Sequence, residues 1–192
     1  MKKVLLLVSI LLVAVISTAC INNFAVQDLN NKAQTYMQKG DYAQAIERLK
    51  SSIDLDPTIF ETHYNLAVAY TQSEDYINAV EEYKKAIEIK SDVPEVYYSL
   101  ATAQNNLIID LEQGRLRMNV DDSLYTPKAE DLNFDEKYEM SEKETSLCEE
   151  LKDSALQNYT KYLDLNPNAK NKAEVEKQME YLAGENKPSD EE

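Results

Sequence analysis

Apolar and polar positions follow a helical period over most of this chain. Through residues 27–93, apolar side chains recur every three or four positions in short stretches, which predicts successive pairs of amphipathic helices. Gly40 suits the left-handed backbone that ends a helix, and Asp41 can cap the helix that follows. The first pair is therefore predicted at about 27–39 and 43–55.

The pattern recurs after 34 residues. Small residues stand where two helices must touch, and Tyr or Leu stands where side chains must fill space. The two copies are Tyr36, Gly40, Asp41, Tyr42, Ala45, Leu49 and Pro57, then Leu66, Ala67, Tyr70, Asp75, Tyr76, Ala79, Tyr83 and Ala86. A helix–turn–helix unit of this period resembles the tetratricopeptide repeat (TPR) family. The resemblance implies a curved surface that binds other proteins and seldom carries chemistry of its own.

In this register the third repeat is too long. The repeats run over about 26–59, 60–93 and 94–167, and the last one holds an insertion of 42 residues at about 109–150. A fourth, degenerate repeat within the insertion would place only polar residues at its helix contacts, so we reject it.

The inserted residues instead prolong both helices of the third repeat. Leu107 and Leu111 continue the apolar stripe of its first helix, and Leu147 and Leu151 begin that of its second. Ser141, with Glu144 after it, has the spacing of a capping box. We expect a long antiparallel hairpin whose tip, about 119–134, is irregular and mobile.

The expected fold class is all-α. It is an α-α superhelix of about three TPR helical hairpins, the third with elongated helices and an inserted tip, plus a C-terminal capping helix. The capping helix is expected at about 170–183, and it closes a TPR domain of residues 27–183. Gly184 ends it, and the acidic tail at 184–192 is expected to be disordered.

The N-terminus has the pattern of an export signal. Lys2 and Lys3 precede an apolar run of 13 residues, Val4–Ile16, which is short for a membrane span. Ser17, Thr18, Ala19 and Cys20 follow the run, and this sequence resembles a bacterial lipobox. The resemblance implies a lipoprotein signal peptide at 1–19, diacylglycerol and palmitate-type acyl chains on Cys20, and a short linker at 20–26. Plain secretion after cleavage and an uncleaved anchor remain the alternatives.

A lipidated Cys20 would attach the chain to a bilayer in the cell envelope. Ile21 is not Asp, so in a diderm the lipoprotein is expected at the outer membrane, facing the periplasm. In a monoderm it is expected on the outer face of the plasma membrane.

Charge and composition exclude several function classes. A formal net charge of −15 disfavours nucleic acid, whose phosphates need clustered cations. The chain offers one histidine, His63, which we expect to pack between helices, and Cys148, which we expect to be half-buried and inert. Three scattered glycines make no phosphate-binding loop. We therefore predict no enzyme activity, no cofactor and no small-molecule substrate.

One metal pattern lies in the insertion. Oxygen-bearing side chains fall near the spacing of a calcium-binding EF-hand loop at Asp131, Asn133, Asp135, Glu139 and Glu142. Position 6 of that loop is Glu136, where the sharp turn requires Gly. We therefore predict no metal site, and a calcium-responsive loop at 131–142 stays a minor alternative.

The resemblance also implies which residues line the concave groove. Carried over from the TPR family, they are Asn30, Gln34, Met37, Gln38, Tyr64, Asn65, Val68, Gln72, Tyr98, Thr102 and Asn105. None of them is charged. Amides can donate to and accept from a peptide backbone, and tyrosines add contact area at low entropic cost. The groove is expected to hold an extended or helical segment of a partner, or else the protein's own tail or capping helix.

Some TPR domains clamp the C-terminal carboxylate of chaperones with Lys, Arg and Asn. At those positions this chain has Asn30, Gln34, Asn65, Glu95 and Ser99, which include no cation. An acidic chain terminus would be poorly compensated there. The predicted function is a membrane-anchored adaptor or scaffold for a protein partner, and the alternative is an accessory subunit of an envelope hydrolase.

Overall fold

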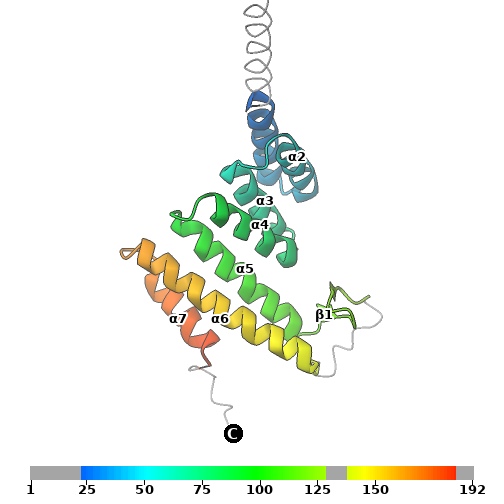
Figure 1. Cartoon of the computed structure of the whole chain (residues 1–192), viewed down its shortest axis with the longest axis vertical. Coiled ribbons are helices and arrows are strands. Elements are labelled where there is room, and N and C mark those ends of the chain that lie inside the picture. The colour runs from blue at the N-terminus through cyan, green and yellow to red at the C-terminus, as the bar shows by residue number, and fades with distance from the viewer. Residues whose placement is uncertain (1–22, 129–137, 185–192) are drawn as a thin grey trace, which may run out of the picture. The chain divides into compact units, whose positions relative to one another are not determined.

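A computed structural model describes residues 23–128 and 138–184. Within these residues the chain is helical over 23–38 and then forms α2 (Tyr42–Leu55), α3 (Phe60–Gln72), α4 (Tyr76–Ile89), α5 (Pro94–Glu112), α6 (Glu142–Leu165) and α7 (Lys172–Leu182). The two strands β1 (Arg117–Met118) and β2 (Leu124–Tyr125) form a short antiparallel ribbon between α5 and α6 (Figure 1). The predicted all-α class, with elongated helices in the third hairpin and a terminal helix after it, is confirmed.

The chain divides into two compact units, one ending at Glu74 and one beginning at Asp75. In the first unit α2 packs against α3, and the contact is made by small and medium apolar residues. Ala45, Leu49 and Ala67 are completely buried there. Close packing of this kind is what the repeated small residues of the sequence predict.

The turn before α2 follows the local sequence. Gly40 has φ +73°, which is open to glycine and strained for other residues. The Asp41 carboxylate then accepts a hydrogen bond from the Gln44 backbone N–H at 3.2 Å, which satisfies one of the free donors at the start of α2.

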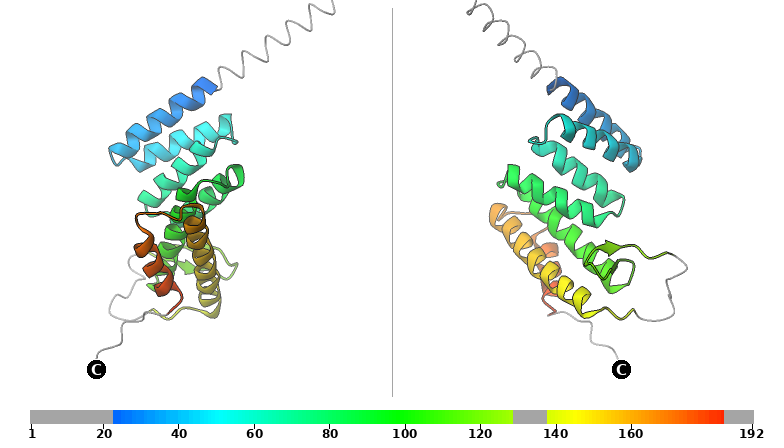
Figure 2. Two further views of the ribbon diagram at one scale, coloured as in Figure 1. Left: turned by 90° about the vertical axis from the view of Figure 1, so that its left-hand side faces the viewer. Right: turned by 45° about the vertical axis from the view of Figure 1, so that its right-hand side comes forward.

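In the second unit α5 and α6 run antiparallel along most of their lengths, and α7 packs against α6 (Figure 2). The core between these helices is apolar, and Ala101, Leu111 and Ala155 are completely buried in it. A polar link crosses it, because Gln104 donates to the Ser154 hydroxyl at 2.7 Å and accepts from the Asn158 amide at 2.9 Å. Gln104 is 1% exposed, so this link fixes how the two helices align.

The first residues of the expected irregular tip, from residue 119, form a tight turn that joins β1 to β2. The Asn119 N–H donates to the Ser123 carbonyl at 2.8 Å, which extends the ribbon beyond β1 and β2. The Asp121 carboxylate accepts from both the N–H and the hydroxyl of Ser123. The sequence shows no helical pattern here, and local bonds from side chains to the backbone hold the turn instead.

Three stretches lie outside the described residues: 1–22, 129–137 and 185–192. The expected signal peptide, Cys20 and most of the acidic tail fall there, as do Asp131, Asn133 and Asp135 of the calcium-like spacing. Across the helices that are described, none combines the length and the apolar character needed to cross a bilayer.

Candidate functional site

The predicted groove residues of the first helix lie at positions 30, 34, 37 and 38, on one helical face of residues 23–38. Gln34 and Gln38 are exposed, and Met37 is half-buried. Exposed amides four residues apart can present two donors and two acceptors to a bound segment. This part of the predicted site is open to a partner.

Asn30 is placed differently. Its Nδ2 lies 2.9 Å from the Ser52 hydroxyl, 2.9 Å from the Thr62 hydroxyl and 3.0 Å from the Val26 carbonyl. Ser52 and Thr62 are completely buried. The side chain therefore joins the first helix to α2 and α3, and its donors are occupied within the fold.

The predicted residues of α3 share one face of that helix. Tyr64, Asn65 and Val68 are half-buried, and Gln72 is exposed. The Tyr64 ring stacks on Phe60 with centroids 6.0 Å apart and planes 10° apart. This stack holds the tyrosine ring in place, so that it can contact a partner without a further loss of side-chain freedom.

The three predicted residues on α5 belong to the second unit. Tyr98 contacts the rings of Tyr159 and Tyr162, with centroids 6.0 and 5.3 Å apart. The Thr102 hydroxyl donates to the Tyr98 carbonyl at 2.9 Å and lies 3.3 Å from the Tyr159 hydroxyl. Both side chains are half-buried against α6, and burial raises the pKa of Tyr159.

Asn105 is half-buried one turn further along α5. Its Oδ1 atom is shielded from solvent and has no hydrogen-bond partner among the described residues, as is also true of Asn30 Oδ1. A shielded amide oxygen with no partner is uncommon in folded proteins.

The residues with reactive side chains are used structurally. His63 is 4% exposed, and its Nε2 lies 2.9 Å from the Pro57 carbonyl, so it packs between helices as expected. Cys148 is 1% exposed, and burial raises the pKa of its thiol to about 11. Within the described residues, no three His, Cys, Asp or Glu side chains are grouped to hold a metal ion.

A comparison with protein families decides what the helical pairs are. The family model described as TPR repeat matches residues 33–73 and again 68–107. Residues 33–107 are TPR repeats. The two matches cover α2, α3, α4 and most of α5, and they stop before the insertion that follows α5.

Solved TPR structures share the fold beyond those residues. The MamA protein is 20% identical with a TM-score of 0.58, over 86% of this chain and 67% of its own. The Arabidopsis OM64 TPR domain is 15% identical with a TM-score of 0.58, over 83% of this chain and 98% of its own. The first TPR of Spaghetti (RPAP3), solved with an HSP90 peptide, is 16% identical with a TM-score of 0.56, over 83% and 91%. A search of curated protein sequences found no match.

The sequence did not reveal two polar clusters of this protein. The repeat pattern pointed to Asn30 but not to its buried partners Ser52 and Thr62, whose hydroxyls look like ordinary surface residues in a helical sequence. The capping-box spacing pointed to Glu144, but nothing local indicated that residues of the insertion bind the same carboxylate. Both clusters depend on contacts between residues more than ten positions apart.

Proposed function

We propose that this protein is a lipid-anchored adaptor of a bacterial cell envelope whose TPR repeats hold a segment of a protein partner. One observation carries the proposal: within a TPR fold, the predicted groove positions of the first unit are uncharged amides, a methionine, a valine and a stacked tyrosine, several of them exposed. TPR folds serve as protein-interaction scaffolds.

The composition of this surface selects the kind of partner. TPR domains of similar fold have been solved with the HSP90 peptide SRMEEVD and the HSP70 peptide SGPTIEEVD, both of which end in acidic residues. The matching positions here, Asn30, Gln34 and Asn65, carry no positive charge, and Asn30 already donates within the fold. An uncharged extended or helical segment therefore fits this surface better than an acidic C-terminus.

The anchor is proposed from the lipobox-like sequence that ends at Cys20. Mass spectrometry of the N-terminal peptide from native membranes should find a diacylglyceryl group on Cys20. A Cys20→Ser variant should leave the membrane fraction. An unmodified Cys20 in membrane-bound protein would contradict the lipid anchor and would leave the TPR repeats unaffected.

Partner binding can be tested apart from the anchor. Cross-linked pull-downs from native membranes would compare the wild type with a Gln34→Ala, Gln38→Ala double variant. Both side chains are exposed, so the fold should persist while the recovered partner declines about tenfold or more. Gln157→Ala is the matched control, because Gln157 is an exposed amide on α6. Equal recovery from both variants would exclude this face as the binding surface.

A further inference from the structure

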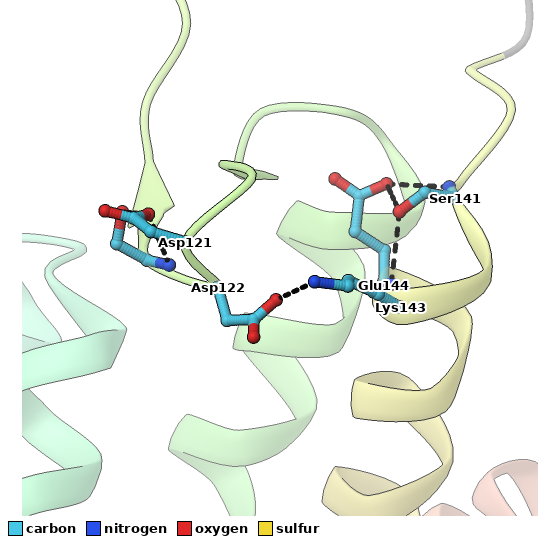
Figure 3. Close-up of polar contacts among 6 residues, drawn as sticks. Asp121, Asp122, Ser141, Lys143 and Glu144 are labelled. Carbon is cyan, nitrogen blue, oxygen red and sulfur yellow. Dashed lines mark hydrogen bonds and ion pairs between the residues drawn. The ribbon is translucent and has the colours of Figure 1, made fainter.

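The start of α6 holds a buried carboxylate that does more than cap a helix. Glu144 is 2% exposed, and its Oε2 accepts from the N–H of Ser141 at 2.8 Å and from the Ser141 hydroxyl at 2.9 Å (Figure 3). In addition, Oε1 accepts from the Met118 N–H at 2.8 Å, and the Tyr138 hydroxyl lies 3.0 Å from both oxygens. One carboxylate thus binds β1, the segment before α6 and α6 itself.

Residues 114–125 and 138–141, which lie within the insertion and are described by the structure, are called the strap below. Its apolar side chains cover the end of the core between α5 and α6. Leu116 is 7% exposed within that core, and Leu124 and Met140 pack against it. The strap therefore packs against this core, and its Met140 lies next to the buried Cys148.

The two ends of the strap also hold each other. The Tyr138 ring lies directly over Gly114, where an added Cβ would come within 2.6 Å of the ring. The Arg117 guanidinium lies over the ring of Tyr138, 4.8 Å from its centroid. Gly114 has φ +67°, so the chain turns sharply where the strap leaves α5.

Helices α5 and α6 are joined without the strap. Gln104, Ser154 and Asn158 link them near the middle of the hairpin, and Thr102 lies near Tyr159 on the side away from the strap. None of these contacts involves Glu144. The hairpin and the strap are therefore separate sets of interactions, which is the condition for one to open while the other stays closed.

We infer that the strap is a conformational device that opens as a unit, with Glu144 as its latch, while α5 and α6 remain paired. If the carboxylate is lost, the Met118 N–H, the Ser141 N–H and the Tyr138 hydroxyl lose the one acceptor group that they share. Met118 and Tyr138 are half-buried, so their donors gain water as partners when the strap lifts, whereas Ser141 is exposed. Shielded donors without acceptors are unfavourable, and this favours the lifted strap. Opening uncovers the distal end of the α5–α6 core.

Cys148 reports this opening. It lies one turn after Glu144, it is 1% exposed, and its Sγ lies 3.8 Å from Met140 Sδ in the strap. In the full-length chain with Cys20→Ser, Cys148 is the only thiol, so its rate of labelling by a soluble disulfide reagent measures the open population.

The test variant is Glu144→Gln, which keeps the shape but turns one acceptor oxygen into a donor facing other donors. We expect Cys148 to label about tenfold faster or more, with unchanged helicity by circular dichroism. Glu142→Gln controls for charge in the first turn of α6. Glu149→Gln controls for charge near the thiol, since the carboxylates of Glu112, Glu149 and Glu144 add to the effect of burial on the pKa of Cys148. Both controls should label within about twofold of wild type.

Hydrogen exchange distinguishes strap opening from unfolding. In Glu144→Gln, the amides of Met118 and Ser141 should exchange faster while the amides around Gln104 and Asn158 stay protected. Wild-type labelling of Cys148 in Glu144→Gln would overturn the inference. Faster exchange of all these amides together would overturn it as well, because the hairpin would then be unfolding with the strap.

Discussion

Two buried polar clusters each join separate segments of this chain, one through a neutral amide and the other through a carboxylate. In the first unit the neutral amide of Asn30 joins the Ser52 and Thr62 hydroxyls, and so links three helices of regular repeats. In the second unit the Glu144 carboxylate joins an irregular insertion to the start of α6. The Asn30 cluster contains no charged group, so its polar groups cost little to bury once they bond to one another. The Glu144 carboxylate is charged, so its burial depends on the donors that surround it.

The difference follows from what each cluster must hold. Helices of a repeat already bury a wide apolar face, so a few neutral hydrogen bonds suffice to set their alignment. The strap has only two short strands and few apolar side chains. Bonds to an ionised acceptor are roughly twice as strong as neutral ones, and they compensate for that small core.

The largest expected loss of stability comes from substituting a glycine, and it should differ between two glycines with similar backbone conformations. Gly40 has φ +73°, and a Cβ added there would meet no atom within 4 Å, whereas Gly114 has φ +67° and lies under the Tyr138 ring. Gly40→Ala should lower the free energy of unfolding by about 1–2 kcal/mol through its backbone alone. Gly114→Ala adds a clash with the ring and should cost about 2–4 kcal/mol. Urea unfolding would measure both, and equal losses would show that the strap does not press on Gly114.

The second prediction concerns the neutral cluster. Asn30→Ala leaves the buried Ser52 and Thr62 hydroxyls with a single weak contact to each other at 3.4 Å, and it should lower the free energy of unfolding by about 1–3 kcal/mol. Asn31→Ala is the matched control, because Asn31 is the exposed neighbour on the same helix and should cost less than about 0.5 kcal/mol. If Asn30→Ala costs no more than the control, Asn30 is free to bind a partner after all.

These contrasts also mark how far the sequence predicts the structure. The 34-residue period sets the helical pairs, and the stripes through Leu111 and Leu151 predict the elongated hairpin, because both signals come from neighbouring turns of one helix. Gly40 likewise predicts the turn before α2, and Ser141 predicts the start of α6, because both signals are local in sequence.

What the sequence could not predict depends on distant contacts. The role of Asn30 requires the facing hydroxyls of α2 and α3, and the burial of Glu144 requires Met118, 26 positions earlier. The β ribbon was missed because each of its strands is two residues long, which is too short to show an alternation of apolar and polar residues. The groove residues of both units remain predictions from the TPR resemblance.

The third prediction uses pH to separate the clusters. Burial by itself raises the pKa of Glu144, but hydrogen bonds from Ser141, Met118 and Tyr138 outweigh it and hold the pKa below its ordinary value of 4.5. A pKa that is lower in the folded state contributes stability that is complete above the unfolded value and is lost as pH falls through the folded value. The strap should therefore loosen in acid below about pH 4.5, and the Asn30 cluster, which does not titrate, should not.

Hydrogen exchange of the Met118 amide would measure this loss, with the Glu144→Gln variant as reference at each pH. The difference in protection between wild type and variant should be constant above the ordinary pKa of Glu144 and should shrink toward zero in acid. A difference that persists unchanged to the lowest pH would mean that the carboxylate is not what holds the strap.

The smallest expected effect is at the surface of the strap. Lys143 forms an ion pair with Asp122, next to Glu144 in sequence but 59% and 65% exposed (Figure 3). Exposed pairs contribute about 0–1 kcal/mol and are screened by salt, so Lys143→Ala should change the free energy of unfolding by less than about 1 kcal/mol, and less still in 1 M salt. The Met118 amide should stay protected in this variant. If Lys143→Ala released the strap as fully as Glu144→Gln, the latch would be the exposed ion pair, and burial of the carboxylate would not be what makes it strong.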